Sequence, residues 1–330
     1  MMLALSMVTA LIISAVTVPL VIAVAKRLKV GQPVLSYVDN HKSKSGTPTF
    51  GGVAFIFATV VCMLVFAKNG RSLALMCVAV SFAYGVIGFT DDFIKTRSKQ
   101  NKGLSALQKI VFQSLISVII ATYAYCEINV GDKLVLPFSL NVVKIGYFAI
   151  PYYVFVFLAF TNAVNLADGL DGLAGKTTVA YLIFFGIIVW LASYFSGEIT
   201  AESENLTLFA FTLACAVCGF LVYNVFPAKI FMGDTGSLAL GGAVGALAVL
   251  SKLSLYAPIL GVIFVITCLS DVIQVAYFKK TGKRVFLMAP LHHHFERKGM
   301  HENRIVAVYT FVTVCVGLVC IVITLALNGH

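Results

Sequence analysis

The sequence predicts an all-α polytopic membrane protein, with about ten transmembrane helices in one domain spanning residues 1–330. Of its 330 residues 60% are hydrophobic and 12% are charged, which is about half the charged share of an average soluble domain. The mean hydropathy is +0.96. The apolar residues also fall into long runs, and about 20 such residues cross the ~30 Å hydrocarbon core as a helix.

The ten predicted spans follow from these runs. They lie near residues 3–25, 50–67, 73–90, 106–126, 147–163, 173–194, 206–223, 236–251, 255–278 and 305–327. The first run has neither a basic leader nor a small-residue cleavage site, so we expect a retained helix. An even number of spans puts both termini on one side of the membrane.

The basic residues predict which side that is. The connectors at 26–50, 91–109, 164–176, 224–235 and 279–304 share one face and hold 19 of the 24 Lys and Arg residues. Cytoplasmic loops carry this excess, so both termini are expected outside the cytoplasm. Because membrane orientation and phosphate attraction account for the net charge of +10, no nucleic-acid partner is expected.

The opposite face offers little chemistry. Residues 126–146 predict a small exterior β-hairpin, and residues 196–205 predict an acidic loop. All eight cysteines lie within spans or at their ends, so we expect packing residues and no disulfides. Cys215 and Cys218 have zinc-ligand spacing, but they lack a second pair and lie in an apolar run.

Ionisable side chains are costly at membrane depth, and here they gather at the cytoplasmic ends of spans. The third span ends in GFTDDFIKTRSK, which places Asp91 and Asp92 before Lys95 and Lys99. Acidic residues merely ending a helix are the alternative, yet the helix dipole disfavours adjacent carboxylates at a C-terminus. An acidic pair beside basic residues therefore predicts a site for a metal-bridged phosphate.

The fifth span runs into NAVNLADGLDGLAG, where Asn162, Asn165, Asp168 and Asp171 recur every three residues. On a helix this spacing predicts a polar stripe; a helix end facing water is the alternative. The following GKT is not a phosphate-binding P-loop, because Leu170 stands where that motif requires glycine.

Two further segments complete the cytoplasmic set. In YNVFPAKIFMGDTGS, Gly233 and Asp234 are expected to open a helix whose free N–H groups face phosphate oxygens; a plain helix cap is the alternative for Asp234. Phe231 could stack on a base or anchor the interface. In MAPLHHHFERK, three successive histidines at 292–294 cannot converge on one zinc ion, so one or two should serve a phosphate site.

Together HKSKSGTPTFGG, GFTDDFIK, NAVNLADGLDGLAG, NVFPAKIFMGDTGS and MAPLHHHFE resemble the polyprenyl-phosphate N-acetylhexosamine-1-phosphate transferase superfamily, along essentially the whole chain. TPTFGG and MAPLHHHFE favour its muramoyl-pentapeptide branch over the N-acetylglucosamine branch, which stays a rival. The resemblance implies a ten-helix enzyme of the bacterial inner membrane with a cytoplasmic active site. It implies that Mg²⁺ supports the reaction of UDP-N-acetylmuramoyl-pentapeptide with undecaprenyl phosphate, which yields lipid I and UMP for peptidoglycan synthesis.

The resemblance also implies roles for matching positions and leaves monomer or homodimer open. The catalytic residues would be Asp91, Asp92 and Asp234, with Asp234 binding Mg²⁺. The residues expected at the nucleotide and the sugar phosphate are Lys44, Thr49, Lys95, Lys99, Asn165, Asp168, Gly169, Leu170, Asp171, Asn224, Phe231, Gln274, His293 and His294.

Two alternatives concern the reaction itself. Direct attack by the lipid phosphate, which Asp91 deprotonates or orients, is expected over a covalent aspartyl-phosphate intermediate. A transporter of nucleotide sugars is the rival from another class. Transporters bind substrate near the bilayer midplane, often between internal repeats, whereas the polar residues here cluster at one face and show no repeat.

Overall fold

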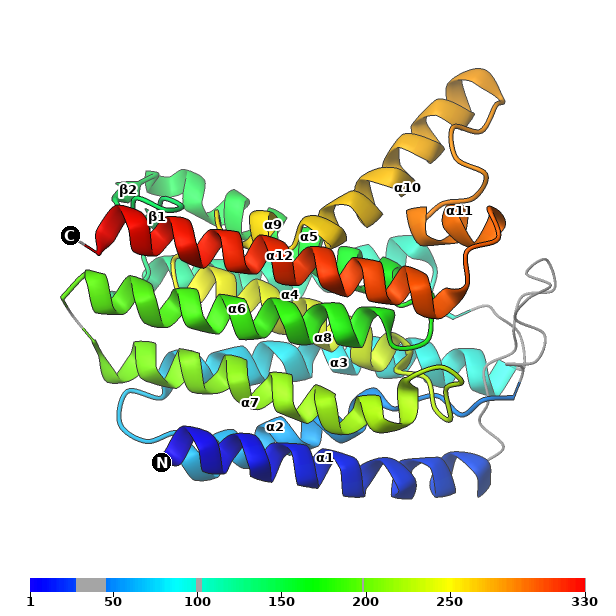
Figure 1. Ribbon diagram of the computed structural model, residues 1–330, viewed down its shortest axis with the longest axis horizontal. Helices are drawn as coiled ribbons and strands as arrows, with labels where there is room; N and C mark the ends of the chain where they lie inside the picture. Colours follow the sequence, from blue (N-terminus) through cyan, green and yellow to red (C-terminus); the bar gives the residue numbers. More distant parts are fainter. Residues whose placement is uncertain (28–45, 99–102, 198, 330) are drawn as a thin grey trace.

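The structure is a computed structural model that describes residues 1–27, 46–98, 103–197 and 199–329. Long helices run side by side as a bundle, and a two-stranded sheet lies at one end (Figure 1). The elements are α1 (Met2–Arg27), α2 (Gly52–Phe66), α3 (Ser72–Ser98), α4 (Ala106–Cys126), β1 (Lys133–Val135), β2 (Val142–Lys144), η2 (Gly146–Phe148), α5 (Ala149–Ala167), α6 (Leu173–Phe195), α7 (Ala201–Asn224), α8 (Gly233–Leu250), α9 (Ala257–Leu260), α10 (Val262–Thr281), α11 (Leu291–Arg297) and α12 (Glu302–Asn328).

Each predicted span contains a helix, and within the described residues nine helices are long and apolar enough to cross a membrane. The tenth, α2, has 15 residues, which at 1.5 Å per residue reach only about 22 Å. The span predicted near 255–278 corresponds mainly to α10, but it contains a break that was not predicted. The chain divides at Gly261 into the single turn of α9 and the long α10, and α10 leans away from the bundle (Figure 1).

Helix α8 is the centre of the bundle, because every one of its residues except Asp234 is buried. Its sequence, GDTGSLALGGAVGALAVL, is rich in Gly and Ala, and small residues let membrane helices approach closely. A Cβ on Gly88 of α3 would overlap the carbonyl oxygen of Asp234, and one on Gly241 would lie 2.5 Å from Thr161 Cα in α5. Both neighbours therefore pack on α8 backbone to backbone.

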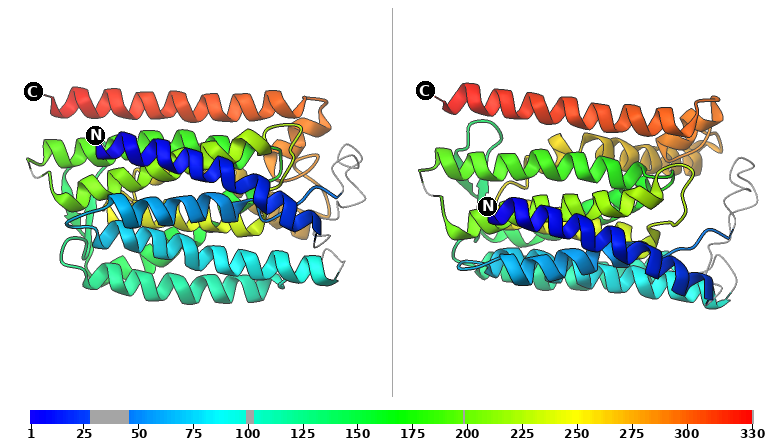
Figure 2. Two further views of the ribbon diagram at one scale, coloured as in Figure 1. Left: turned by 90° about the horizontal axis from the view of Figure 1, so that it is seen from below. Right: turned by 60° about the horizontal axis from the view of Figure 1, so that its bottom comes forward.

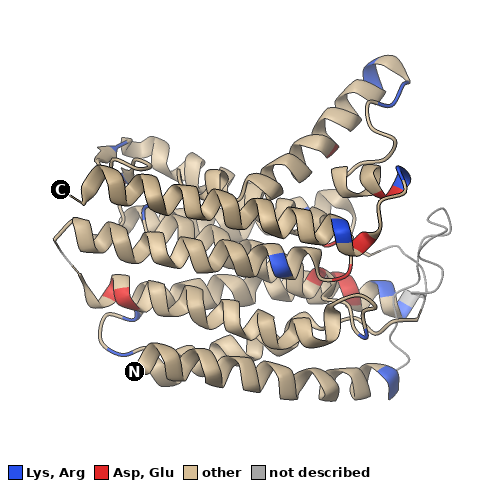
Figure 3. Ribbon diagram, in the orientation of Figure 1, with Lys and Arg blue, Asp and Glu red and all other residues tan. Residues whose placement is uncertain are grey.

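The two termini lie at the same end of the bundle (Figures 1 and 2), as an even number of spans predicts. Most charged residues gather at the other end, and the middle of the bundle is nearly free of them (Figure 3). The predicted hairpin is confirmed at the termini's end, where β1 and β2 pair antiparallel. The cysteines are free, as predicted.

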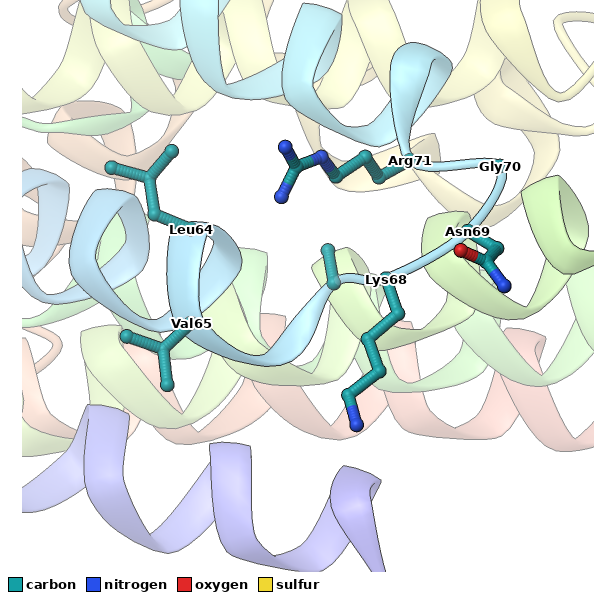
Figure 4. Close-up of a pocket in the computed structure, with 7 residues that line it drawn as sticks. Leu64, Val65, Lys68, Asn69, Gly70 and Arg71 are labelled. Carbon is teal, nitrogen blue, oxygen red and sulfur yellow. The ribbon is translucent and has the colours of Figure 1, made fainter.

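A surface pocket of about 530 Å³ lies beside the loop between α2 and α3, lined by residues 64, 65 and 67–71. Lys68 and Arg71 extend to opposite sides of this loop (Figure 4). Arg71 lies directly before α3, about 30 Å by helical rise from the acidic pair near the other end of that helix. The pocket is therefore remote from the predicted chemistry.

The close crossing of α3 and α8 predicts the behaviour of two glycines. Gly88→Ala should lower the thermal unfolding midpoint and impair activity, because overpacking against a helix backbone costs about 1–3 kcal/mol. Gly85→Ala is the matched control in the same helix, since its Cβ would meet the flexible end of Ile56 at 3.2 Å and would lie no nearer than 3.4 Å to any atom of α8. Thermal unfolding of both purified variants checks this, and equal midpoints would contradict the packing described.

Candidate active site

Three carboxylates meet at the charged end of the bundle. Asp91 and Asp92 lie in the last two turns of α3, and Asp234 lies in the first turn of α8. One oxygen from each lies within 4.8 Å of the others. Asp91 is fully buried and Asp92 is 4% exposed, so neither is an ordinary solvated helix end.

Asp92 holds the N-terminus of α8. Its Oδ1 accepts the backbone N–H of Asp234 at 3.2 Å, and its Oδ2 accepts the N–H and the hydroxyl of Thr235 at 2.9 and 2.7 Å. The prediction that these N–H groups are free for phosphate is therefore wrong. The capping residue position belongs to Met232, so the plain-cap alternative for Asp234 is wrong as well.

Asp91 and Asp234 share two lysines. The Nζ of Lys95 lies 2.6 Å from Asp91 Oδ2 and 3.0 Å from Asp234 Oδ2. The Nζ of Lys109 lies 3.0 and 2.6 Å from the same two oxygens. The four side chains form a partly buried cluster of two negative and two positive charges, which we call the Asp–Lys cluster.

Lys109 was not predicted as a site residue. From the sequence it was counted only among the basic residues that mark the cytoplasmic side. It stands in the first turn of α4, within the otherwise largely apolar stretch ALQKIVF. A single lysine inside an apolar helix could have indicated a site, because a charge in that environment needs a partner. Its partners lie in α3 and α8, and the residues around Lys109 in the sequence do not predict them.

Asn165 connects α5 to the cluster. Its Nδ2 donates to Asp234 Oδ1 at 3.0 Å and to Ser237 Oγ at 2.8 Å. Asn162 instead donates to Gln113 Oε1 at 2.8 Å. The predicted four-residue helical stripe is wrong in its second half, because α5 ends at Ala167 and the two aspartates belong to the following turn.

That turn runs from Asp168 to Gly172. Burial raises the pKa of Asp168 well above its usual range, and the neighbouring carboxylates of Asp234, Asp92 and Asp171 raise it further. Leu170 is buried at 3% exposure. A Cβ on Gly169 would overlap the His292 ring, so glycine at this position admits that histidine.

The connection between α7 and α8 is fixed by polar contacts. Asn224 accepts the Gly172 N–H at 3.1 Å and donates to the Ile230 carbonyl at 2.9 Å, so its amide serves the protein itself. The half-buried Phe231 donates its N–H to the Pro48 carbonyl at 2.8 Å and accepts the Gly51 N–H at 2.9 Å. The backbone of Phe231 is thus paired with the segment 48–51, which is distant in sequence.

The remaining predicted positions fall into two groups. Thr49 is buried beside Gly233, where an added Cβ would lie 2.6 Å from its hydroxyl oxygen. Lys44 and Lys99 lie outside the described residues. The structure therefore gives a position for Thr49 only, and it lies next to the capped start of α8.

The last connector carries the histidines on α11, and their rings have different neighbours. His292 is fully buried, His293 Nδ1 lies 2.6 Å from Glu296 Oε2, and His294 Nδ1 accepts the Leu287 N–H at 3.1 Å. Gln274 also serves this connector, since its Oε1 accepts the Phe286 N–H at 2.9 Å. The three imidazoles do not form one metal site.

The Asp–Lys cluster fits a divalent cation. Asp91, Asp92 and Asp234 are the one set of His, Cys, Asp and Glu side chains in the described part of the chain that could hold a metal ion. Asp92 already accepts three hydrogen bonds, so the Oδ2 atoms of Asp91 and Asp234, which face the two lysines, are the oxygens left for a cation. Hard carboxylate oxygens suit Mg²⁺, which is usually bound by one or two carboxylates together with substrate phosphates.

Comparison with known proteins agrees with this geometry. A family model described as glycosyl transferase family 4 matches residues 74–252. The phospho-N-acetylmuramoyl-pentapeptide-transferase of Clostridium novyi (strain NT) is 41% identical over 98% of this chain and 97% of its own. The enzyme of the same name from Clostridium kluyveri is 44% identical over 91% and 92%. The chain therefore belongs to glycosyl transferase family 4, within its group of phospho-N-acetylmuramoyl-pentapeptide transferases.

Because Asp91 and Asp92 have different surroundings, we expect their substitutions to affect stability and turnover differently. Asp92→Asn should lower the thermal unfolding midpoint, because an amide cannot accept all three hydrogen bonds and each bond to a charged group contributes about 1.5–3 kcal/mol. Asp91→Asn can still accept the Leu104 N–H, which lies 2.7 Å from Asp91 Oδ1. It should abolish turnover with a smaller change in the midpoint. Circular dichroism melts beside turnover assays check this, and equal midpoint losses would contradict it.

Proposed function

We propose that this protein transfers phospho-N-acetylmuramoyl-pentapeptide from its UDP-linked form to undecaprenyl phosphate, giving lipid I and UMP. The observation that carries the proposal is the Asp–Lys cluster at one end of a membrane bundle. The two relatives of this chain described above bear the name of that activity, and they are 41% and 44% identical to it over nearly its full length. The charged end of the bundle (Figure 3) would face the cytoplasm of a bacterial plasma membrane, by the positive-inside rule.

The reaction needs charge compensation more than a strong base. An oxygen of the lipid phosphate attacks the β-phosphorus of the UDP portion, and the bond from that phosphorus to the oxygen of UMP breaks. Bound between Asp91 and Asp234, Mg²⁺ would neutralise charge on the diphosphate. Asp91 would orient the attacking phosphate, which makes direct attack the simpler path than a covalent aspartyl intermediate.

The two lysines of the cluster would change partners during the reaction. In the structure Lys95 and Lys109 neutralise Asp91 and Asp234. With a metal and a diphosphate bound, the ammonium groups of the two lysines could turn to phosphate oxygens, where negative charge grows as UMP leaves. The nucleotide would lie near the turn 168–172 and Phe231, with His293 and His294 close to the sugar phosphate.

An assay of UMP release tests the proposal. The purified protein should release UMP from UDP-N-acetylmuramoyl-pentapeptide only when undecaprenyl phosphate and Mg²⁺ are both present. A transporter would leave the UDP-sugar intact. Product from UDP-N-acetylglucosamine alone would overturn the choice of substrate, and turnover undiminished by chelation would remove the metal.

The same assay tests whether Lys109 contributes to turnover. Lys109→Gln should lower kcat about 100-fold or more, which is the scale for removing one preorganised electrostatic contact. Lys144→Gln, on the exposed strand β2 at the opposite end, is the matched control and should leave turnover unchanged. A Lys109 variant with wild-type kcat would exclude this lysine from the chemistry.

A further inference from the structure

The start of α12 meets the turn that follows α5. Glu302 lies in the first turn of α12 with 8% of its surface exposed. Its Oε1 accepts the backbone N–H of Asp171. The two residues are 131 positions apart in sequence, so this hydrogen bond joins the last helix of the chain to the turn 168–172.

The same turn is tied to the connection between α7 and α8. The Asp171 Oδ2 accepts the Ala228 N–H at 2.9 Å, and Asn224 accepts the Gly172 N–H at 3.1 Å. His301, next to Glu302, packs its ring against Phe226 with centroids 5.3 Å apart. Three segments thus form one junction, made of the turn 168–172, the connection 225–232 and the start of α12.

A buried carboxylate at this junction needs a reason, since an ionised group taken from water is costly unless it is hydrogen-bonded. One reason is structural: acidic residues stabilise the first turn of a helix through its dipole, and Glu204 has the corresponding position in the first turn of α7. Glu302 differs from Glu204 because its oxygen reaches the backbone of another segment. A carboxylate bond to an N–H is shorter and stronger than a neutral one, so it fixes where that backbone lies.

We propose that Glu302 is a positioning residue for nucleotide binding. By holding the Asp171 N–H it sets the shape of the turn 168–172 before substrate arrives. This inference rests on the proposed function, which places the nucleotide against that turn. Nothing in it requires Glu302 to touch substrate. Its loss should therefore weaken nucleotide binding and leave the chemistry at Asp91 and Asp234 largely intact.

Three substitutions separate positioning from helix stabilisation. Glu302→Asp keeps the charge at the helix start but is one methylene too short to reach Asp171, whereas Glu302→Gln keeps a carbonyl acceptor at full length. Glu204→Ala is the matched control at the other end of the bundle. KM for the UDP-linked substrate, kcat and calorimetric binding of UMP are measured for each, together with the unfolding midpoint.

The Asp variant should raise KM and the Kd of UMP about tenfold, which corresponds to about 1.4 kcal/mol, with kcat within about threefold of wild type. The Gln variant should stay within about threefold on all three constants, and Glu204→Ala should change none. A wild-type KM in the Asp variant would overturn the proposal. Weakened UMP binding in the Gln variant would overturn it as well. If wild-type protein binds UMP but releases none from substrate, the proposed function fails, and UMP binding by the variants still decides the role of Glu302.

Discussion

The cap that Asp92 of α3 places on the first turn of α8 is the interaction on which the site depends. The first N–H groups of a helix have no partners within it, and a buried helix start that lacks acceptors is costly. Helix α8 is buried along its length, so its start requires an acceptor from another element. Because Asp92 supplies it across 142 positions of sequence, α8 begins beside Asp92, near the end of α3. That constraint brings Asp234 beside Asp91.

The Asp–Lys cluster follows from that meeting. Two carboxylates sharing a partly buried site repel each other, and removing charges from water is costly unless they are well paired. Lys95 and Lys109 supply two cations within 3.0 Å of both carboxylates, which leaves the four groups neutral together. A divalent cation entering alone would make the cluster strongly positive. A cation that arrives with a diphosphate keeps the balance, which suits the proposed reaction.

The helices were predictable from sequence because the signal for them is local. Runs of apolar residues predict α1, α2, α4 to α8 and α12 within about five residues, whereas α3 continues to Ser98, beyond the predicted span 73–90. The even number of spans predicts that both termini share one end. The break at Gly261 was not predicted, since the residues on both sides of Gly261 are apolar and the break depends on how α10 leaves the bundle. The roles of Asp92, Lys109 and Asp171 could not be predicted for a related reason. Each depends on a partner more than 50 positions away, and spacing along one helix carries no information about such contacts.

The central claim is that Asp91 and Asp234 together hold a divalent cation between the lysines, while Asp92 serves α8. Electron paramagnetic resonance of Mn²⁺, titrated into the purified protein with UMP present, tests this most directly. We expect one bound Mn²⁺ per chain in the wild type, and its loss in both Asp91→Asn and Asp234→Asn when each remains folded. Retention of the bound Mn²⁺ signal in both variants would contradict the account.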